Sequence, residues 1–404
     1  MARSKRYILA GFGLLAIGAC AAIAVTSGSD GSPAGIQEAL ENLSAGRYDL
    51  AEQQAMVLVN NPADPVHRAW MIVGAARQGQ GQYASAARAY RMFLAACTSG
   101  ELREYALSAI SACQAGANPQ SAEPAAPSKR LSGAQQRELA AVEEELVTES
   151  TSHFVVRARN AKLAKLVAAE AEASLEHICR VILAGQEYPH GVDIYVWTDR
   201  RDYLAHASDA PEWSGGSFSM TARDGAVTRR IDLTQRDERG RFAIIMFDRV
   251  LPHELCHLVI KEYFGDAACP LFLSEGLAML AEAEADNERV ILAGTALAGK
   301  GKVPLDDLVV RQRNDAGDPA VFYAESFSFA EFLRHRMTER QFREFLEHVK
   351  SGCPVSDSLQ RAMYLPPDEG FTAKLSGAWE DHAILQAQIL RIVREQDLRT
   401  ARRE

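Results

Sequence analysis

The chain has 404 residues, of which 47% are hydrophobic and 24% are charged, and its formal net charge is −9 at pH 7. This composition excludes a wholly disordered chain and is typical of a folded protein with more than one domain. The acidic balance argues against a nucleic-acid partner, because phosphate recognition requires a concentrated basic face.

The first 30 residues have the pattern of a signal peptide or a membrane anchor. The cationic sequence MARSKR precedes an apolar run from Tyr7 to Val25, and a polar, glycine-rich segment follows. Three outcomes stay open, namely cleavage after Ala24, lipidation at Cys20, and retention of the run as a membrane span. In each case we expect the rest of the chain to work outside the cytoplasm, in the cell envelope or periplasm, and we favour retention at the membrane.

Residues 34–116 are predicted to form a domain of helical repeats. The sequences GRYDLAEQQAMVL, from Gly46, and GQYASAARAYRMF, from Gly81, share glycine, tyrosine and alanine in register at an offset of 35 residues. This segment resembles a short tetratricopeptide array, and residues 101–113 are expected to cover its exposed end. A partner-binding groove and a simple packing or spacer module are equally consistent with so few repeats.

Residues 117–133 are rich in proline, alanine and serine and contain almost no large apolar side chain. Such a composition cannot build a core, so we expect a flexible linker. It separates the repeats from a second predicted domain, residues 134–404.

The second domain begins with a mixture of helix and strand patterns. The expected elements are a charged helix over 134–150, a strand over 153–159, a helix over 160–184 and a strand over 191–198. Residues 214–235 alternate apolar and polar side chains around Asp224-Gly225, which predicts a β-hairpin. Because the chain from Phe242 onward is almost entirely helical in pattern, the domain is predicted to be α+β, with a small mixed sheet and a helical catalytic part.

The sequence VLPHELCHLVI, residues 250–260, contains two histidines and a glutamate within an apolar helix pattern. His253 and His257 are one helical turn apart, so their rings can bind a single ion. Glu254 lies beside them and can act as a general base. Such a motif also arises by chance, but three buried polar groups without partners would each cost about 1–3 kcal/mol, which favours a metal site.

A third metal ligand is expected on the next helix. Glu275 follows His257 by 18 residues, which leaves room for a loop and the start of a helix packed against the first. Gly276, beside Glu275, is expected to keep the contact between these two helices thin. Three later acidic residues are expected on the solvated continuation of the second helix: Glu282, Glu284 and Asp286.

The sequence HELCH followed by LFLSEGLAML resembles the gluzincin metallopeptidases, specifically their compact peptidase MA-like domains. The likeness extends over roughly residues 151–390 and includes PEWSGG, YAESFSFAEFL and KLSGAWEDH. It implies that His253, His257 and Glu275 bind Zn²⁺. It also implies that Glu254 is the general base, and later the proton donor, for the attack of a zinc-activated water on a peptide bond.

Two positions depart from the family pattern, with Phe272 where a tryptophan is common and Met279 where a tyrosine is common. Tyr323 matches a tyrosine that recurs in similar domains, and the resemblance implies that it stabilises the oxyanion as a second electrophile. The alternative for Tyr323 is packing on its own helix. The other histidines have no partner at ligand spacing and are expected at the surface or in capping roles.

Three functions stay open from the sequence. The first is a zinc metallopeptidase outside the cytoplasm that acts on a peptide or protein substrate, with a possible protein partner on its repeats and a membrane contact through its leader. An extended substrate is expected to pair with an edge of the hairpin over residues 214–235, for which ordinary sheet closure is the alternative role. The second function is a catalytically silent scaffold that uses the repeats, and the third is a zinc hydrolase with another substrate.

Overall fold

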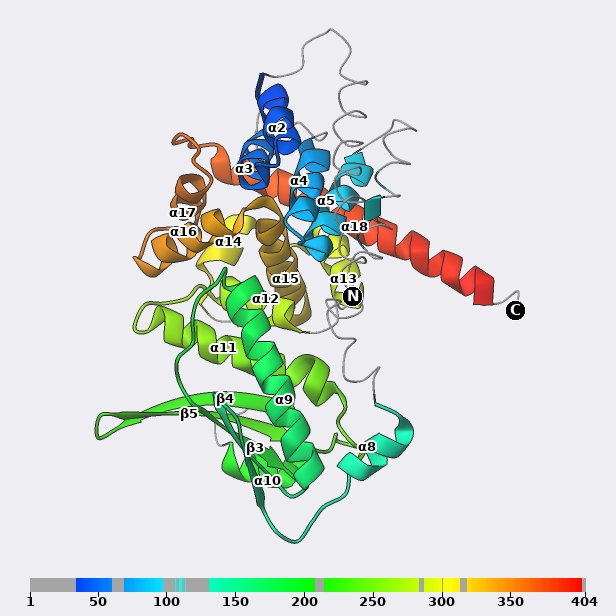
Figure 1. Ribbon diagram of the computed structural model, residues 1–404, viewed down its shortest axis with the longest axis vertical. Coiled ribbons are helices and arrows are strands. Elements are labelled where there is room, and N and C mark those ends of the chain that lie inside the picture. Colours follow the sequence, from blue (N-terminus) through cyan, green and yellow to red (C-terminus); the bar gives the residue numbers. More distant parts are fainter. Residues whose placement is uncertain are drawn as a thin grey trace, which may run out of the picture. The chain divides into compact units, whose positions relative to one another are not determined.

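The computed structural model describes residues 34–59, 69–96, 106, 109–110, 113, 131–207, 214–282, 287–299, 301–312 and 318–401 (Figure 1). The predicted leader and nearly all of the predicted linker lie outside these residues. Among the described helices, none is both long enough and apolar enough to cross a membrane.

The described chain forms two compact units. One contains the described residues up to 113 together with 332–341 and 360–375, and the other contains the described residues of 124–331, 342–359 and 376–401. The fold class is α+β, as predicted, with an all-α hairpin region followed by a small mixed sheet and its helices.

Two helical hairpins make up the N-terminal region. They are α2 (Ala34–Ser44) with α3 (Tyr48–Val59), and α4 (Ala69–Gly79) with α5 (Tyr83–Ala96). Each hairpin turns at a glycine in the left-handed region, with φ of 72° at Gly46 and 79° at Gly81. The backbone N–H of each glycine donates to a carbonyl three residues earlier, that of Leu43 or Gln78. The offset of 35 residues therefore repeats one turn geometry, since only glycine adopts this conformation without strain.

Close approach of the helices fills the core of this region. A Cβ added to Gly74 would lie 2.6 Å from the ring of Tyr90, and one added to Gly79 would lie 2.5 Å from the ring of Tyr48. The described residues of the expected covering segment, which include Ala106 and Ile110, are helical and buried in the same apolar cluster.

A five-stranded mixed sheet forms the centre of the second unit. Its order is β1 (Val147–Ser150), β2 (Phe154–Ala158), β3 (Val192–Trp197), β5 (Ala226–Thr234) and β4 (Gly216–Arg223). The pairs β2–β3 and β3–β5 are parallel, whereas β1–β2 and β4–β5 are antiparallel. The crossover from β2 to β3 contains α9 (Ala161–His177), whose first turn is capped by the Asn160 side chain.

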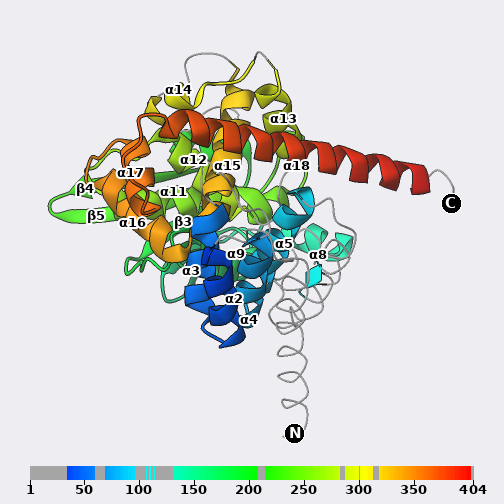
Figure 2. The ribbon, with the colours of Figure 1, turned by 90° about the horizontal axis from the view of Figure 1, so that it is seen from above.

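The predicted hairpin is confirmed. Strand β4 pairs with β5 from Gly216↔Leu233 to Arg223↔Ala226, so the connection has two residues. These are Asp224 and Gly225, with φ of 51° and 80°. Positive φ at both positions is the requirement of the type I′ turn that joins twisted strands. The hairpin extends well beyond the other strands in Figures 1 and 2.

The predicted helix over 134–150 is wrong in its second half. Helix α8 (Gly133–Leu139) begins with a capping box at Ser132 and ends after two turns, and the chain then forms β1. Two buried amides take the carbonyls that a longer helix would use. The side chain of Asn160 donates to Glu138 and Ala141, and that of Gln235 donates to Leu139 and Ala141. Pairing with β2 and these long-range bonds override the local helix propensity.

The remaining elements are helical. They are α10 (Arg200–His206), α11 (Leu251–Phe264), α12 (Leu271–Ala281), α13 (Asn287–Leu297), α14 (Leu305–Val310), α15 (Pro319–Arg336), α16 (Glu339–Lys350), α17 (Val355–Ala362), α18 (Phe371–Ala401), and the π-helical turns Ile178–Ile182 and Met246–Val250. Helices α9 and α11 pack against each other, α9 also against β1 and β2, and α11 also against β4 and β5. The long α18 is the red helix of Figure 2, and Gly294 of α13 packs directly on its Ala383 and Ala387.

Candidate metal centre

Helix α11 carries the two histidines and lies directly beside the outer strand of the sheet. It continues from the π-helical turn Met246–Val250, with Pro252 in its first turn, and it ends at Gly265, where φ is 60°. A Cβ added to Gly216 of β4 would lie 2.3 Å from a methyl group of Val250, so strand and helix are in tight contact. This packing fixes the helix face that bears the histidines.

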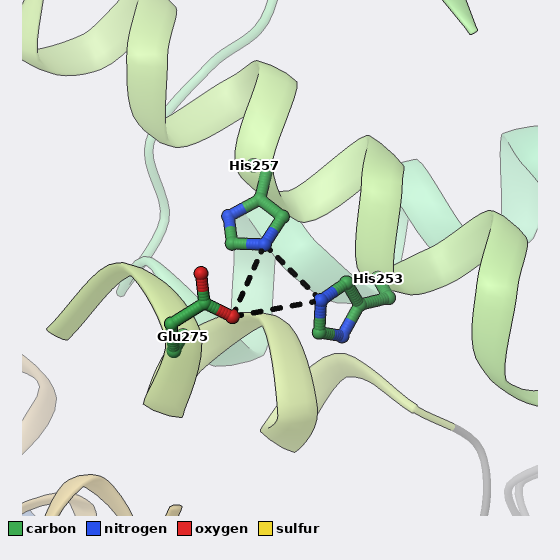
Figure 3. Close-up of side chains that lie close together, drawn as sticks. All are labelled: His253, His257 and Glu275. Atoms are coloured by element: carbon green, nitrogen blue, oxygen red, sulfur yellow. Dashed lines mark hydrogen bonds and ion pairs between the residues drawn. The ribbon is translucent and has the colours of Figure 1, made fainter. Parts of the chain in front are cut away.

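Three donor atoms from two helices converge on one point (Figure 3). His257 Nε2 lies 3.1 Å from His253 Nε2, and Glu275 Oε2 lies 3.8 Å from His253 Nε2 and 3.6 Å from His257 Nε2. Donors at zinc-ligand bond lengths in a tetrahedron are about 3.3 Å apart, so the spacing suits such an ion. The structure therefore brings together the three residues that the sequence singled out as ligands.

The second ring nitrogen of each histidine has its own partner. His253 Nδ1 lies 3.1 Å from Glu282 Oε1, and His257 Nδ1 lies 3.0 Å from Ser274 Oγ. Both Nε2 atoms are thereby directed at Glu275. Outer partners of this kind hold the rings of metal-binding histidines in orientation.

The prediction that Glu282 is a surface residue is wrong. Its side chain is 4% exposed, and besides His253 it contacts Arg249 at 3.6 Å and Arg289 at 3.3 Å. It lies directly after α12, whereas the guanidinium groups come from the turn before α11 and from α13. The sequence missed it because a glutamate at a helix end is usually solvated, and its buried partners are distant along the chain. Glu284 and Asp286 lie outside the described residues.

Glu254 is partly buried and lies beside the outer strand of the sheet. Burial raises its pKa, against the nearby imidazoles of His257 and His253, which lower it. The backbone of Phe218 in β4 lies beside the Glu254 carboxylate and lowers its pKa, and the Phe218 ring stacks on His257 with centroids 5.7 Å apart. Phe218 therefore lies against both the predicted base and one predicted ligand, and only the strand–helix contact reveals this.

The pKa values of Glu275 and His253 are both shifted by oppositely charged neighbours. Burial alone would raise the pKa of Glu275, but the nearby His257 and His253 rings outweigh it, so this pKa is lowered. Burial would lower the pKa of His253, but the bond to Glu282 and the surrounding carboxylates raise it. The site thus contains several carboxylates and ring nitrogens that a bound cation would satisfy.

Gly276 has a different role from the one expected. A Cβ at this position would lie 2.5 Å from the carbonyl oxygen of Ser326 and 2.6 Å from the Cβ of Ala330, both in α15. The thin contact is therefore between α12 and α15. The preceding residue, Glu275, has its side chain directed toward the histidines of α11.

Tyr323 lies on α15 and packs with Met279, Val290 and Phe327 in a small apolar cluster. Its role beside a developing oxyanion stays a prediction. Phe272 is fully buried, with its ring centroid 5.4 Å from that of Phe329, so this departure from the family pattern fills the core. The surface role expected for the other histidines is wrong for His335 and His382, which are both buried.

Comparison with known proteins identifies the family. No curated protein matches the chain. A family model described as Peptidase MA superfamily matches residues 173–379, which include α11, α12 and Tyr323. Because this match spans about half of the chain and contains the converging His253, His257 and Glu275, the chain belongs to the Peptidase MA superfamily.

Proposed function

We propose that this protein is a zinc-dependent metallopeptidase that hydrolyses peptide bonds. The observation that carries the proposal is the convergence of His253 Nε2, His257 Nε2 and a Glu275 oxygen, with the carboxylate of Glu254 on the same helix. Two imidazoles and one carboxylate are the ligand chemistry of catalytic zinc sites, which leave a further position open.

The chain's own residues have separable roles in such a reaction. When bound here, Zn²⁺ would lower the pKa of a water molecule and polarise the carbonyl of the substrate. Glu254 would take a proton from the attacking water and deliver it to the departing amine. Phe218, which lies beside the Glu254 carboxylate, would restrict the position of this carboxylate during both transfers.

The outer strand β4 is the proposed docking edge for an extended substrate. Among the described strands it is the outermost, and it packs along α11, so a chain added to its outer edge would run beside the helix that bears the histidines. Backbone pairing of this kind tolerates many side chains, which agrees with the lack of a sequence signal for specificity.

We also propose that the protein works outside the cytoplasm and is held at the membrane. The cationic, apolar leader of residues 1–30 supports this location. The all-α hairpins α2 to α5 are the proposed surface for a protein partner, by their resemblance to tetratricopeptide repeats.

The test compares the full-length wild type with Glu254→Gln. Zinc content is measured by metal analysis, and hydrolysis is measured on casein and a peptide library. We expect zinc in both proteins, with hydrolysis lower by about 10²–10⁴-fold in the variant, the usual contribution of a general base.

Each other result would count against the proposal. Zinc bound without Glu254-dependent cleavage would favour a catalytically silent scaffold that acts through its helical repeats. Zinc-dependent hydrolysis of another ester or amide, without cleavage of peptides, would favour a zinc hydrolase with another substrate. If metal analysis found no zinc in the protein, all the zinc-dependent functions would be excluded.

A further inference from the structure

The two predicted histidine ligands are held by chemically different groups. His253 Nδ1 faces the carboxylate of Glu282 at 3.1 Å, whereas His257 Nδ1 faces the hydroxyl of Ser274 at 3.0 Å. A carboxylate can only accept a hydrogen bond, but a hydroxyl can accept or donate. Glu282 therefore fixes the proton of a neutral His253 ring on Nδ1, whereas Ser274 is compatible with either tautomer of His257.

Glu282 is itself held in place by two cations. Arg249 Nε lies 3.6 Å from Glu282 Oε2, one helical turn before His253. Arg289 of α13 lies within 3.3–3.4 Å of both carboxylate oxygens. With 4% of its side chain exposed, Glu282 has little access to water and is held by protein partners on three elements.

On the basis of the proposed function, we infer that Glu282, anchored by Arg249 and Arg289, is a positioning residue of the metal site. It orients His253 so that Nε2 is the free electron-pair donor toward the metal. It also places a second carboxylate beside Glu275 in the site, and two guanidinium groups hold this carboxylate in place. Ser274 orients His257 more weakly, since hydrogen bonds to ionised groups are roughly twice as strong as neutral ones.

The main test is Glu282→Gln in the full-length protein, with Glu262→Gln as the matched control. Glu262 lies on α11, the helix of both histidines, and accepts two bonds from Arg229, both at 2.8 Å, but it contacts no predicted ligand. Zinc affinity is measured by competition with a chelator, and the unfolding temperature is measured with and without zinc. Absorption bands of the Co²⁺-loaded protein report the ligand geometry.

We expect Glu282→Gln to weaken zinc binding by about 10–100-fold, the usual effect of losing an outer partner of a ligand histidine. The rise in unfolding temperature on adding zinc should shrink with it, and the Co²⁺ bands should shift. Glu262→Gln should lower the unfolding temperature equally with and without zinc and leave zinc affinity and the Co²⁺ bands unchanged. Ser274→Ala should weaken zinc binding less than Glu282→Gln does.

Wild-type zinc affinity in a folded Glu282→Gln protein would overturn the inference, and so would an equal loss in Glu262→Gln. If Glu282→Gln does not fold, Arg289→Met is the alternative test, because it removes the bonds from Arg289 to Glu282 and keeps the Glu282 carboxylate. Weaker zinc binding in that variant supports the inference, and wild-type affinity overturns it. The wild type could bind zinc and cleave peptides while the Glu282 and Arg289 variants keep wild-type zinc affinity. That result would contradict this inference alone and would leave the proposed function unchanged.

Discussion

The helical repeats and the metal centre both bury charged and polar groups, but they satisfy them differently. In the repeats, buried groups pair one to one, as in the ion pair of Arg77 with Glu52 at 2.9 Å and the bond from the Tyr90 hydroxyl to the Gln78 side-chain oxygen at 2.9 Å. In the metal centre, two imidazoles and a carboxylate point at one another. Burial of polar residues alone therefore does not mark a site. A site is marked by several acceptors that converge on one point.

Replacing a predicted ligand should have the largest effect. Glu275→Gln keeps the size of the side chain and removes its charge, so we expect zinc affinity to fall by about 10³-fold, given the large share that each ligand has in zinc binding. Hydrolysis should fall with it. Chelator competition measures the affinity, and Glu52→Gln in the repeats is the control that should bind zinc normally. Normal zinc affinity in Glu275→Gln would remove this residue from the ligand set.

Breaking the matched pair in the repeats should affect stability and leave zinc binding intact. Glu52→Leu leaves Arg77 buried without its anion, which typically costs about 3–5 kcal/mol of unfolding free energy. Denaturant unfolding followed by circular dichroism measures the loss. The double variant Glu52→Leu with Arg77→Met should recover most of it, and failure of the second change to restore stability would contradict the pairing.

A third kind of buried carboxylate predicts a pH dependence. Glu325 is fully buried, accepts a bond from the Val303 N–H at 3.0 Å, and its Oε1 has no hydrogen-bond partner within the described chain. Burial raises its pKa to about 7, with Lys302, Arg311 and Glu380 as the charged groups nearby. The folded state thus binds this proton more tightly than the unfolded state. The resulting stability is complete below the ordinary pKa and is lost as the pH rises through about 7.

Glu325→Gln removes this dependence and keeps an acceptor for Val303. We expect the variant to exceed the wild type by about 3 kcal/mol of unfolding free energy above pH 8 and to match it near pH 4, by the usual conversion of a pKa shift. Denaturant titrations at several pH values measure the difference. A constant difference across this range would show that Glu325 does not titrate as described.

The smallest effects should come from the repeat turns. Gly46→Ala and Gly81→Ala place a side chain at φ of 72° and 79°, with open space around both positions. Each should cost about 1 kcal/mol from backbone strain alone. Thermal unfolding of the two variants measures this, and clearly unequal losses would contradict the equivalence of the two hairpins.

Local signals in the sequence predicted much of the fold and the core of the site. The Asp224-Gly225 turn fixed the register of the β4–β5 hairpin, because positive φ at both positions allows only a narrow set of turns. The spacing of His253 and His257 placed both rings on one helix face. These features depend on residues close together in the chain, whose geometry is set by helix and turn dimensions.

Long-range contacts decided the rest. Residues 140–150 follow a helical composition, yet β1 forms because it pairs with β2 and because Gln235 takes the carbonyls near the end of α8. Gly276 packs against α15 and not α11, which no local pattern distinguishes.

By itself, the sequence determined the α+β class, the helical hairpins, and a helix on which two histidines and a glutamate lie within about one turn. Only the tertiary structure decided that Glu282 is buried against His253, and that Phe218 lies beside Glu254. The physical reason is that the solvation of a polar side chain depends on groups brought to it from elsewhere in the chain. Helical periodicity describes only the few residues on either side.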